Sequence, residues 1–168
     1  FSDVIIGSSK WIWTTGASDQ GSAFLYYGSA IGLGAGMNPA FGLQLFGNGS
    51  NVAYYGFWAA CAGDLNGDGY SDVAVGAYNE ENGQTDEGKV YVYNGSGTGL
   101  AAAPAVVLES NQAGCWMGRC MNTAGDVNGD GYADLLVGIT RYTNGQSLEG
   151  AGWLYLGSPT GIPTTPSL

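Results

Sequence analysis

The chain has 168 residues, 45% of them apolar, and a formal net charge of −10 from fourteen acidic residues against four basic ones. This size suits one compact domain or a few small repeated units. Four cations cannot neutralise a row of phosphates, which excludes nucleic acid as a partner and disfavours an anionic membrane surface. No apolar run reaches the roughly 18 residues of a membrane span. The chain also has no histidine, which removes Ser-His-Asp triads and histidine–zinc sites.

Short segments rich in aromatic and β-branched residues, separated by Gly and Asn, follow one another along the whole chain. Such runs are typical of strands, and no stretch has the sustained 3.6-residue apolar stripe of a helix. The sequence therefore predicts an all-β fold. In chain order the expected strands are residues 1–7, 21–28, 41–47, 55–64, 72–77, 89–95, 105–110, 117–126, 134–139 and 152–157.

These segments form an internal repeat. At an offset of 62, residues 55–100 align with residues 117–162 without a gap and are identical at 22 of 46 positions. The start of the chain matches the same pattern, so we expect about 2.7 four-stranded units. Four short strands in roughly 60 residues are typical of a β-propeller blade and less typical of a sandwich. The units are a partial blade over 1–54 that lacks its first strand, a complete blade over 55–116, and a blade over 117–168 that lacks its last strand.

Two acidic loops, residues 64–72 and 126–134, share the pattern Asp-x-Asn-x-Asp-Gly-x-x-Asp. Oxygen-bearing side chains at positions 1, 3 and 5 converge as the chain curls, the Gly permits a sharp turn, and position 7 offers its carbonyl. These are hard ligands that suit Ca²⁺ better than Mg²⁺, and we expect two calcium sites. The expected ligands are Asp64, Asn66, Asp68, the carbonyl of Tyr70 and Asp72 in the first loop, and Asp126, Asn128, Asp130, the carbonyl of Tyr132 and Asp134 in the second.

The loops differ from an EF-hand, because Val75 and Val137 stand at position 12 and expected strands flank the loops. A solvated turn without metal is the alternative, since Asn-Gly and Asp-Gly are ordinary hairpin signals. Three carboxylates within nine residues repel one another unless a cation neutralises them, which favours calcium.

The repeated loop and the residues around it resemble the FG-GAP repeat of integrin-α-type β-propellers. Tyr55-Gly56 and Met117-Gly118 stand at the Phe-Gly position of that repeat, and residues 88–95 (GKVYVYNG) match its tyrosine-rich strand. The resemblance implies calcium-stabilised blades on an extracellular surface, with the same ten calcium ligands. Asp3 matches position 9 alone. Known propellers need four or more blades to close, usually seven in this family, so the partners expected are further blades of the same longer chain or copies that complete one another.

The expected function is a non-enzymatic extracellular module for adhesion, recognition or scaffolding, secreted or on the cell surface, with a protein or glycan ligand and no insertion into a membrane. One alternative is a subunit of an extracellular filament or ring that assembles head-to-tail by strand completion. Another is a carbohydrate-binding module that uses Trp11 and Trp13 in a loop, where packing within the blade is the competing interpretation.

Three smaller features complete the expectations. Cys115 and Cys120 bracket a short connection and can form a disulfide in a secreted protein, whereas Cys61 is expected to be a buried thiol. Asn48 and Asn94 fit the N-glycosylation pattern. The acidic stretch at residues 78–88 is expected to be a solvated loop.

Overall fold

The structure is a computed structural model, and it describes all residues except 1, 13–17, 31, 34–41 and 48–52. The secondary structure of the described residues consists of strands and turns without a helix, which confirms the all-β prediction. Consequently, no helix in this part of the chain is long and apolar enough to cross a membrane.

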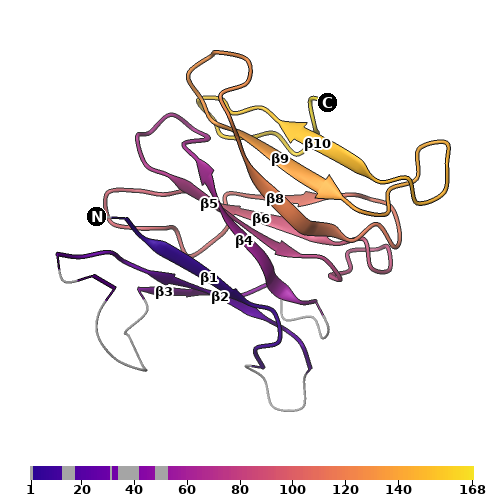
Figure 1. Cartoon of the computed structure of the whole chain (residues 1–168), viewed down its shortest axis with the longest axis horizontal. Helices are drawn as coiled ribbons and strands as arrows, with labels where there is room; N and C mark the ends of the chain where they lie inside the picture. Colours follow the sequence, from indigo (N-terminus) through magenta and orange to yellow (C-terminus); the bar gives the residue numbers. More distant parts are fainter. Residues whose placement is uncertain (1, 13–17, 31, 34–41, 48–52) are drawn as a thin grey trace.

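Three antiparallel sheets follow one another along the chain, and each pairs strands that are consecutive in sequence (Figure 1). The first sheet has the order β1-β2-β3, the middle sheet β4-β5-β6-β7 and the third sheet β10-β9-β8. The strands are β1 (Val4–Ser8), β2 (Ser22–Tyr26), β3 (Leu43–Leu45), β4 (Tyr55–Gly63), β5 (Asp72–Ala77), β6 (Lys89–Tyr93), β7 (Val106–Glu109), β8 (Met117–Gly125), β9 (Asp134–Ile139) and β10 (Ala151–Tyr155).

Equivalent strands of the repeat are built alike, down to their irregularities. The register of β4 against β5 shifts between Tyr55 and Trp58, and again between Cys61 and Gly63. The register of β8 against β9 shifts at the two corresponding places, 62 residues later. Because a bulge bends a strand and increases its twist, β4 and β8 are expected to bend at equivalent places.

The middle sheet is covered on both faces, and its side chains alternate between two cores. Val73, Val75 and Ala77 of β5 pack toward the first sheet, whereas Ala74 packs toward the third. The same period of two sends the tyrosines of β6 to one side and its valines to the other. All the residues of β5 and β6 are buried, as expected for a sheet between two others.

Neighbouring sheets approach so closely that their backbones touch at glycines. A Cβ added to Gly76 of β5 would lie 1.9 Å from the carbonyl oxygen of Gly118 in β8. One repeat earlier, a Cβ on Gly7 of β1 would lie 2.0 Å from the carbonyl oxygen of Gly56 in β4. The two contacts occupy equivalent repeat positions, so one geometry places both pairs of sheets.

The outer faces of the stack are uncovered. Leu136 of β9 is 47% exposed, although its equivalent Ala74 in the middle sheet is fully buried. Ile6 of β1, on the opposite side of the stack, is 50% exposed. The described sheets therefore do not close into a ring.

At the end of the chain, Ser167 and Leu168 form backbone hydrogen bonds with Leu154 of β10. Residues 105–106 pair with β6 in the same way one repeat earlier.

The glycine contact makes a direct prediction. The Gly76→Ala change forces a methyl group against the backbone of β8, and we expect it to lower the free energy of unfolding by about 1–3 kcal/mol or more. Gly152→Ala is the matched control, because a Cβ on this strand glycine meets only Leu136 Cδ1 at 3.9 Å. Urea denaturation of both variants measures the difference, and equal midpoints would contradict the close approach.

Candidate functional site

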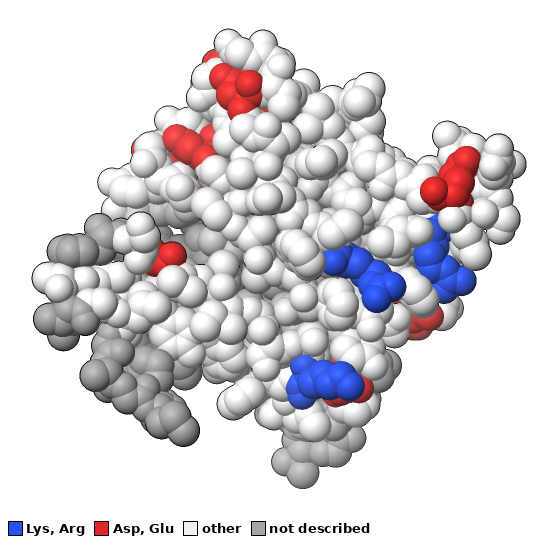
Figure 2. Space-filling model, viewed as in Figure 1, with Lys and Arg blue, Asp and Glu red and all other residues white. Residues whose placement is uncertain are grey.

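The two acidic loops lie at the tips of the β4–β5 and β8–β9 hairpins. Each begins directly after the first strand of its sheet, and each ends on the first residue of the next strand, Asp72 or Asp134. Both tips point toward the same side of the molecule, where Figure 2 shows acidic groups over them. The repeat thus brings together two copies of the same cluster.

The carboxylate of Asp64 organises the first loop by accepting backbone hydrogen bonds. Its Oδ1 accepts from Gly67 N at 2.7 Å and Asp68 N at 3.0 Å, and its Oδ2 accepts from Gly69 N at 2.8 Å. The side chain of Asn66 also turns inward, where its Oδ1 accepts from Asp68 N at 3.0 Å. Positions 1 and 3 therefore face the inside of the curl, as the spacing predicts.

The Asp72 carboxylate joins the loop to the turn that follows β6, the neighbouring strand of its own sheet. It is fully buried, and its two oxygens accept from Leu65 N at 2.9 Å and from Gly95 N at 2.8 Å. Burial raises the pKa of Asp72, the two backbone hydrogen bonds lower it, and the charges of Asp68 and Asp64 raise it further. A negative charge at this position is therefore costly unless a cation accompanies it.

The second loop repeats this arrangement. Its first carboxylate accepts from three backbone amides at 2.7–3.1 Å, and Asp134, also fully buried, accepts from Val127 N and Gly157 N at 2.8 Å each. The common plan extends to the first sheet, where Asp3 Oδ1 accepts from Gly28 N at 2.8 Å. The loop pattern does not predict this second role of position 9, although the Gly-Ser that recurs after each tyrosine-rich strand is a signal for it.

Backbone hydrogen bonds join the first loop to the second loop and to the turn that follows β10. The carbonyl oxygen of Asp64 accepts from Ala133 N at 2.8 Å, and that of Leu65 accepts from Ser158 N at 3.1 Å. A Cβ on Gly67 would lie 2.5 Å from the ring of Tyr132, so the second loop covers the first closely. The Leu65 side chain is only 1% exposed and belongs to the core shared with the third sheet. The first loop therefore belongs to two sheets at once.

The donor set of the loops fits a hard divalent cation. It consists of carboxylate, amide and carbonyl oxygens. Among the described residues, both ion pairs are formed by Lys89, so no basic side chain there neutralises the loop carboxylates. In the part of the chain that the structure describes, however, no three His, Cys, Asp or Glu side chains surround one point as metal ligands do. The loop amides satisfy the carboxylates instead, and a cation would have to draw these carboxylates together. The ten ligands stay a prediction.

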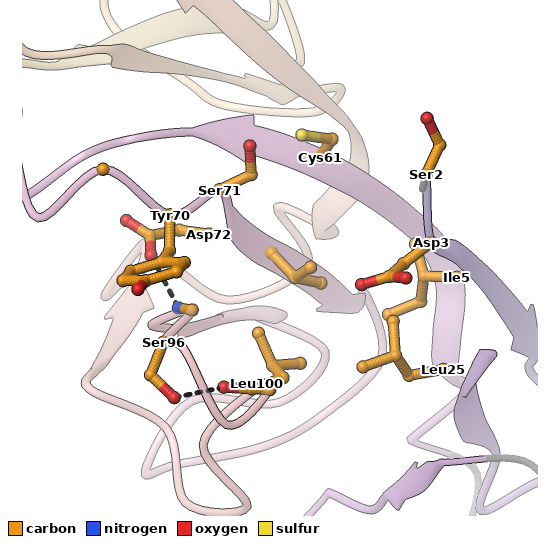
Figure 3. A pocket seen from close by; sticks show the side chains of 14 residues that line it. Ser2, Asp3, Ile5, Leu25, Cys61, Tyr70, Ser71, Asp72, Ser96 and Leu100 are labelled. Carbon is orange, nitrogen blue, oxygen red and sulfur yellow. Dashed lines mark hydrogen bonds between the residues drawn. The ribbon is translucent and has the colours of Figure 1, made fainter. Parts of the chain in front are cut away.

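A pocket of about 480 Å³ lies between the first and middle sheets beside the first loop. Asp3 extends into it from one wall, and Tyr70 and Asp72 lie on the opposite wall (Figure 3). Cys61 also lines the pocket and is exposed, so the expectation of a buried thiol is wrong. The bulged end of β4 lies beside this opening, which leaves the thiol uncovered.

The acidic stretch at residues 78–88 is not the solvated loop that its composition indicates, because Glu80 and Glu87 are fully buried. Glu80 Oε1 lies 3.2 Å from Lys89 Nζ and accepts a 2.5 Å hydrogen bond from the Tyr91 hydroxyl. Burial raises the pKa of Glu80, and its bonds to Tyr91 and Lys89 oppose the shift. The repeat positions of Glu80 and Tyr91 hold pairs of aromatic residues in the other two blades, Trp11 with Phe24 in the first and Tyr142 with Trp153 in the third.

Two cysteines, Asn94 and Trp11 are the remaining residues that the sequence singles out. Cys115 and Cys120 are both free thiols, the first buried and bonded to the side-chain oxygen of Gln112, and their disulfide stays a prediction. Asn94 is half-buried after β6, whereas Asn48 lies outside the described residues, as does Trp13. Trp11 packs edge-on against Phe24, at 5.3 Å between ring centroids.

Stacked antiparallel sheets of up to four strands, two of which carry an acidic loop between their first two strands, define these units as β-propeller blades. The family model of the FG-GAP repeat matches residues 56–93 and 122–155. The chain is 35% identical to human integrin alpha-7 over 137 residues, 42% to chicken integrin alpha-V over 90 and 36% to Xenopus laevis integrin alpha-4 over 116. The chain therefore carries FG-GAP repeats and is homologous to integrin alpha chains.

These matches cover 81%, 51% and 68% of the chain respectively. They span only 11%, 8% and 11% of the integrin subunits. The chain thus corresponds to about a tenth of the length of these relatives.

The buried Glu80 generates a pH prediction. Because its pKa is raised above the ordinary value of 4.5, the stability that it contributes is present below that pH and is lost as the pH rises. Glu80→Gln removes this loss, so we expect the variant to gain stability relative to the wild type between pH 4 and 7. The slope of the difference cannot exceed about 1.4 kcal/mol per pH unit.

Urea denaturation in calcium-free buffer measures both curves without a contribution from calcium. Glu81→Gln, which neutralises an exposed neighbour, is the control and should run parallel to the wild type. A Glu80→Gln curve that also runs parallel would contradict the prediction.

Proposed function

We propose that this chain is a non-enzymatic, calcium-binding part of an extracellular β-propeller that serves adhesion, recognition or scaffolding. The observation that carries the proposal is the pair of joined acidic loops, each closed by a fully buried aspartate. A buried carboxylate beside further carboxylates favours a bound cation. Homology to integrin alpha chains supports the adhesion-related, extracellular setting.

Calcium in this role is structural. One ion in the first loop would fix the β4–β5 hairpin and, through Asp64 and Leu65, the contact with the third sheet. Two ions would change the formal charge from −10 to −6, since each adds two positive charges. The ligands are the ten residues that the repeated pattern predicts, with the carbonyls of Tyr70 and Tyr132 included.

The affinity needed is modest and matches an extracellular setting. With a dissociation constant on the order of 0.1 mM and free calcium of about 1 mM, mass action stabilises the folded state by about 1.4 kcal/mol per site. The same sites would be empty at cytosolic calcium concentrations. Calcium would therefore help to hold the blades together only outside the cell.

The partners of this stack are further blades of the same longer chain. Leu136 and Val127, 47% and 54% exposed, lie at positions whose middle-sheet equivalents are buried by the next sheet. A further blade would cover them in the same way. The relatives are also far longer than this chain, which supports further blades over self-association.

A second candidate is head-to-tail assembly of separate copies into a filament or ring. Its support is the unpaired outer edge of β1 among the described residues, because an exposed strand edge pairs with whatever strand fits it. The carbohydrate-binding alternative receives less support, since Trp11 packs on Phe24 within its own sheet.

Removal of calcium tests the main proposal. We expect EGTA to lower the melting temperature by roughly 3–6 °C per site, as about 1.4 kcal/mol predicts for a chain of this size. Asp64→Asn and Asp126→Asn keep one side-chain oxygen acceptor and should each remove about half of the calcium response. Glu81→Gln removes the same charge outside the loops and should leave it intact. A midpoint that does not move with calcium would refute structural calcium.

The assembly state separates the two candidates. If further blades of the same chain cover the open faces, the 168-residue chain should elute as a 17.2 kDa monomer whose mass does not rise with concentration. Head-to-tail completion predicts a ladder of multiples that grows with concentration. Size-exclusion chromatography with light scattering distinguishes these outcomes.

A further inference from the structure

Two of the four cations of the chain gather around one tryptophan. The Cζ atom of Arg141 lies 4.2 Å from the centroid of the Trp116 ring, and that of Arg119 lies 5.0 Å from it. Arg119 also lies 5.0 Å from the Tyr78 ring and 5.4 Å from the Phe57 ring. We call these five residues the arginine–aromatic cluster.

The cluster is built where the middle and third sheets meet. Phe57, Tyr78 and Trp116 come from the middle blade, and the two arginines come from the third. Trp116 directly precedes β8 and holds a left-handed backbone, with φ of 57°, which turns the chain sharply before the strand. The backbone N–H of Arg141 donates to the carbonyl of Cys115 at 3.3 Å and thereby places the arginine beside the ring.

The cluster has donors without acceptors. Among the described residues, neither guanidinium forms an ion pair or donates a side-chain hydrogen bond. The indole nitrogen of Trp116 is buried and likewise has no acceptor in this part of the chain. Each guanidinium carries five N–H donors in a planar fork, and stacking on aromatic rings holds that fork in place. In a chain of net charge −10, two such unpaired cations at one point are conspicuous.

The surface around the cluster remains accessible. Phe57 is 40% exposed, and both arginines and Tyr78 are half-buried. The cluster lies at the start of β8, and the second acidic loop follows the end of this strand. The rise of a nine-residue strand separates the two by roughly 25 Å. Consistent with this separation, Figure 2 shows the basic groups on the right and bottom of the molecule, away from the acidic hairpin tips.

We infer that the arginine–aromatic cluster is a docking site for a carboxylate-bearing segment of a partner protein. A carboxylate matches the guanidinium fork with two parallel hydrogen bonds, and the aromatic rings offer apolar area beside it. Trp, Tyr and Arg are also the residues that dominate binding energy in protein interfaces. The inference deepens the recognition role proposed above, because it names a surface and the chemistry of its partner.

The test is a selection from a displayed library of random short peptides against the 168-residue chain in millimolar Ca²⁺. We expect the selected peptides to be enriched in Asp and Glu relative to the starting library. Arg119→Gln and Arg141→Gln should each weaken a selected peptide by roughly tenfold or more, as loss of a charged hydrogen bond predicts. Arg141→Lys keeps the charge without the fork and should fall between them and the wild type.

Lys10→Gln is the matched control, since Lys10 occupies the position of Arg141 in the first blade, is exposed and contributes the same charge. It should leave binding unchanged. The inference is overturned if acidic peptides are not enriched, if Lys10→Gln weakens them equally, or if only sulfated oligosaccharides bind in a parallel array. An intact melting response to calcium alongside any of these results would leave the proposed function standing, so the two failures are distinguishable.

Discussion

The contact between backbones at paired glycines is the constraint on which the rest of the structure depends. Where Gly76 meets Gly118, and Gly7 meets Gly56, no space remains for a side chain. Each sheet must therefore lie against the next at one distance and one register. The same geometry brings Gly21 beside Tyr55 and Gly88 beside Met117 in isolated parallel bridges. Three repeat positions, each held by glycine in two places, thus determine how the sheets stack, and the stacking creates both cores between them.

The acidic loops follow from this stacking. Because β4 and β8 lie against each other along their length, the loops after them also meet, and the carbonyls of Asp64 and Leu65 reach the third sheet. Such a contact concentrates negative charge that neither loop balances by itself. A cation would offset this charge at the point where two sheets join. The residues whose mutual repulsion destabilises the fold are therefore the same residues that are proposed to bind calcium.

The three blades differ in residue type at a few repeat positions. One repeat position holds Trp11, Glu80 and Tyr142 in the three blades, each with the same backbone hydrogen bond to a following glycine. Another holds a lysine, an asparagine and Arg141, and only in the third blade does this position meet Trp116. The repeated positions maintain the scaffold, whereas the departures produce the buried ion pair and the arginine–aromatic cluster.

The sequence by itself determined the strands, the repeat and the pattern of the loops, because side-chain alternation, turn glycines and ligand spacing are all local properties. It also predicted the inward curl of Asp64 and the strand position of Asp72. It could not predict the burial of Glu80, the exposure of Cys61 or the meeting of Arg119 and Arg141 at one ring. Those facts depend on which faces of neighbouring sheets touch, and only the tertiary structure decides that, because residues far apart in sequence must pack before their surroundings exist.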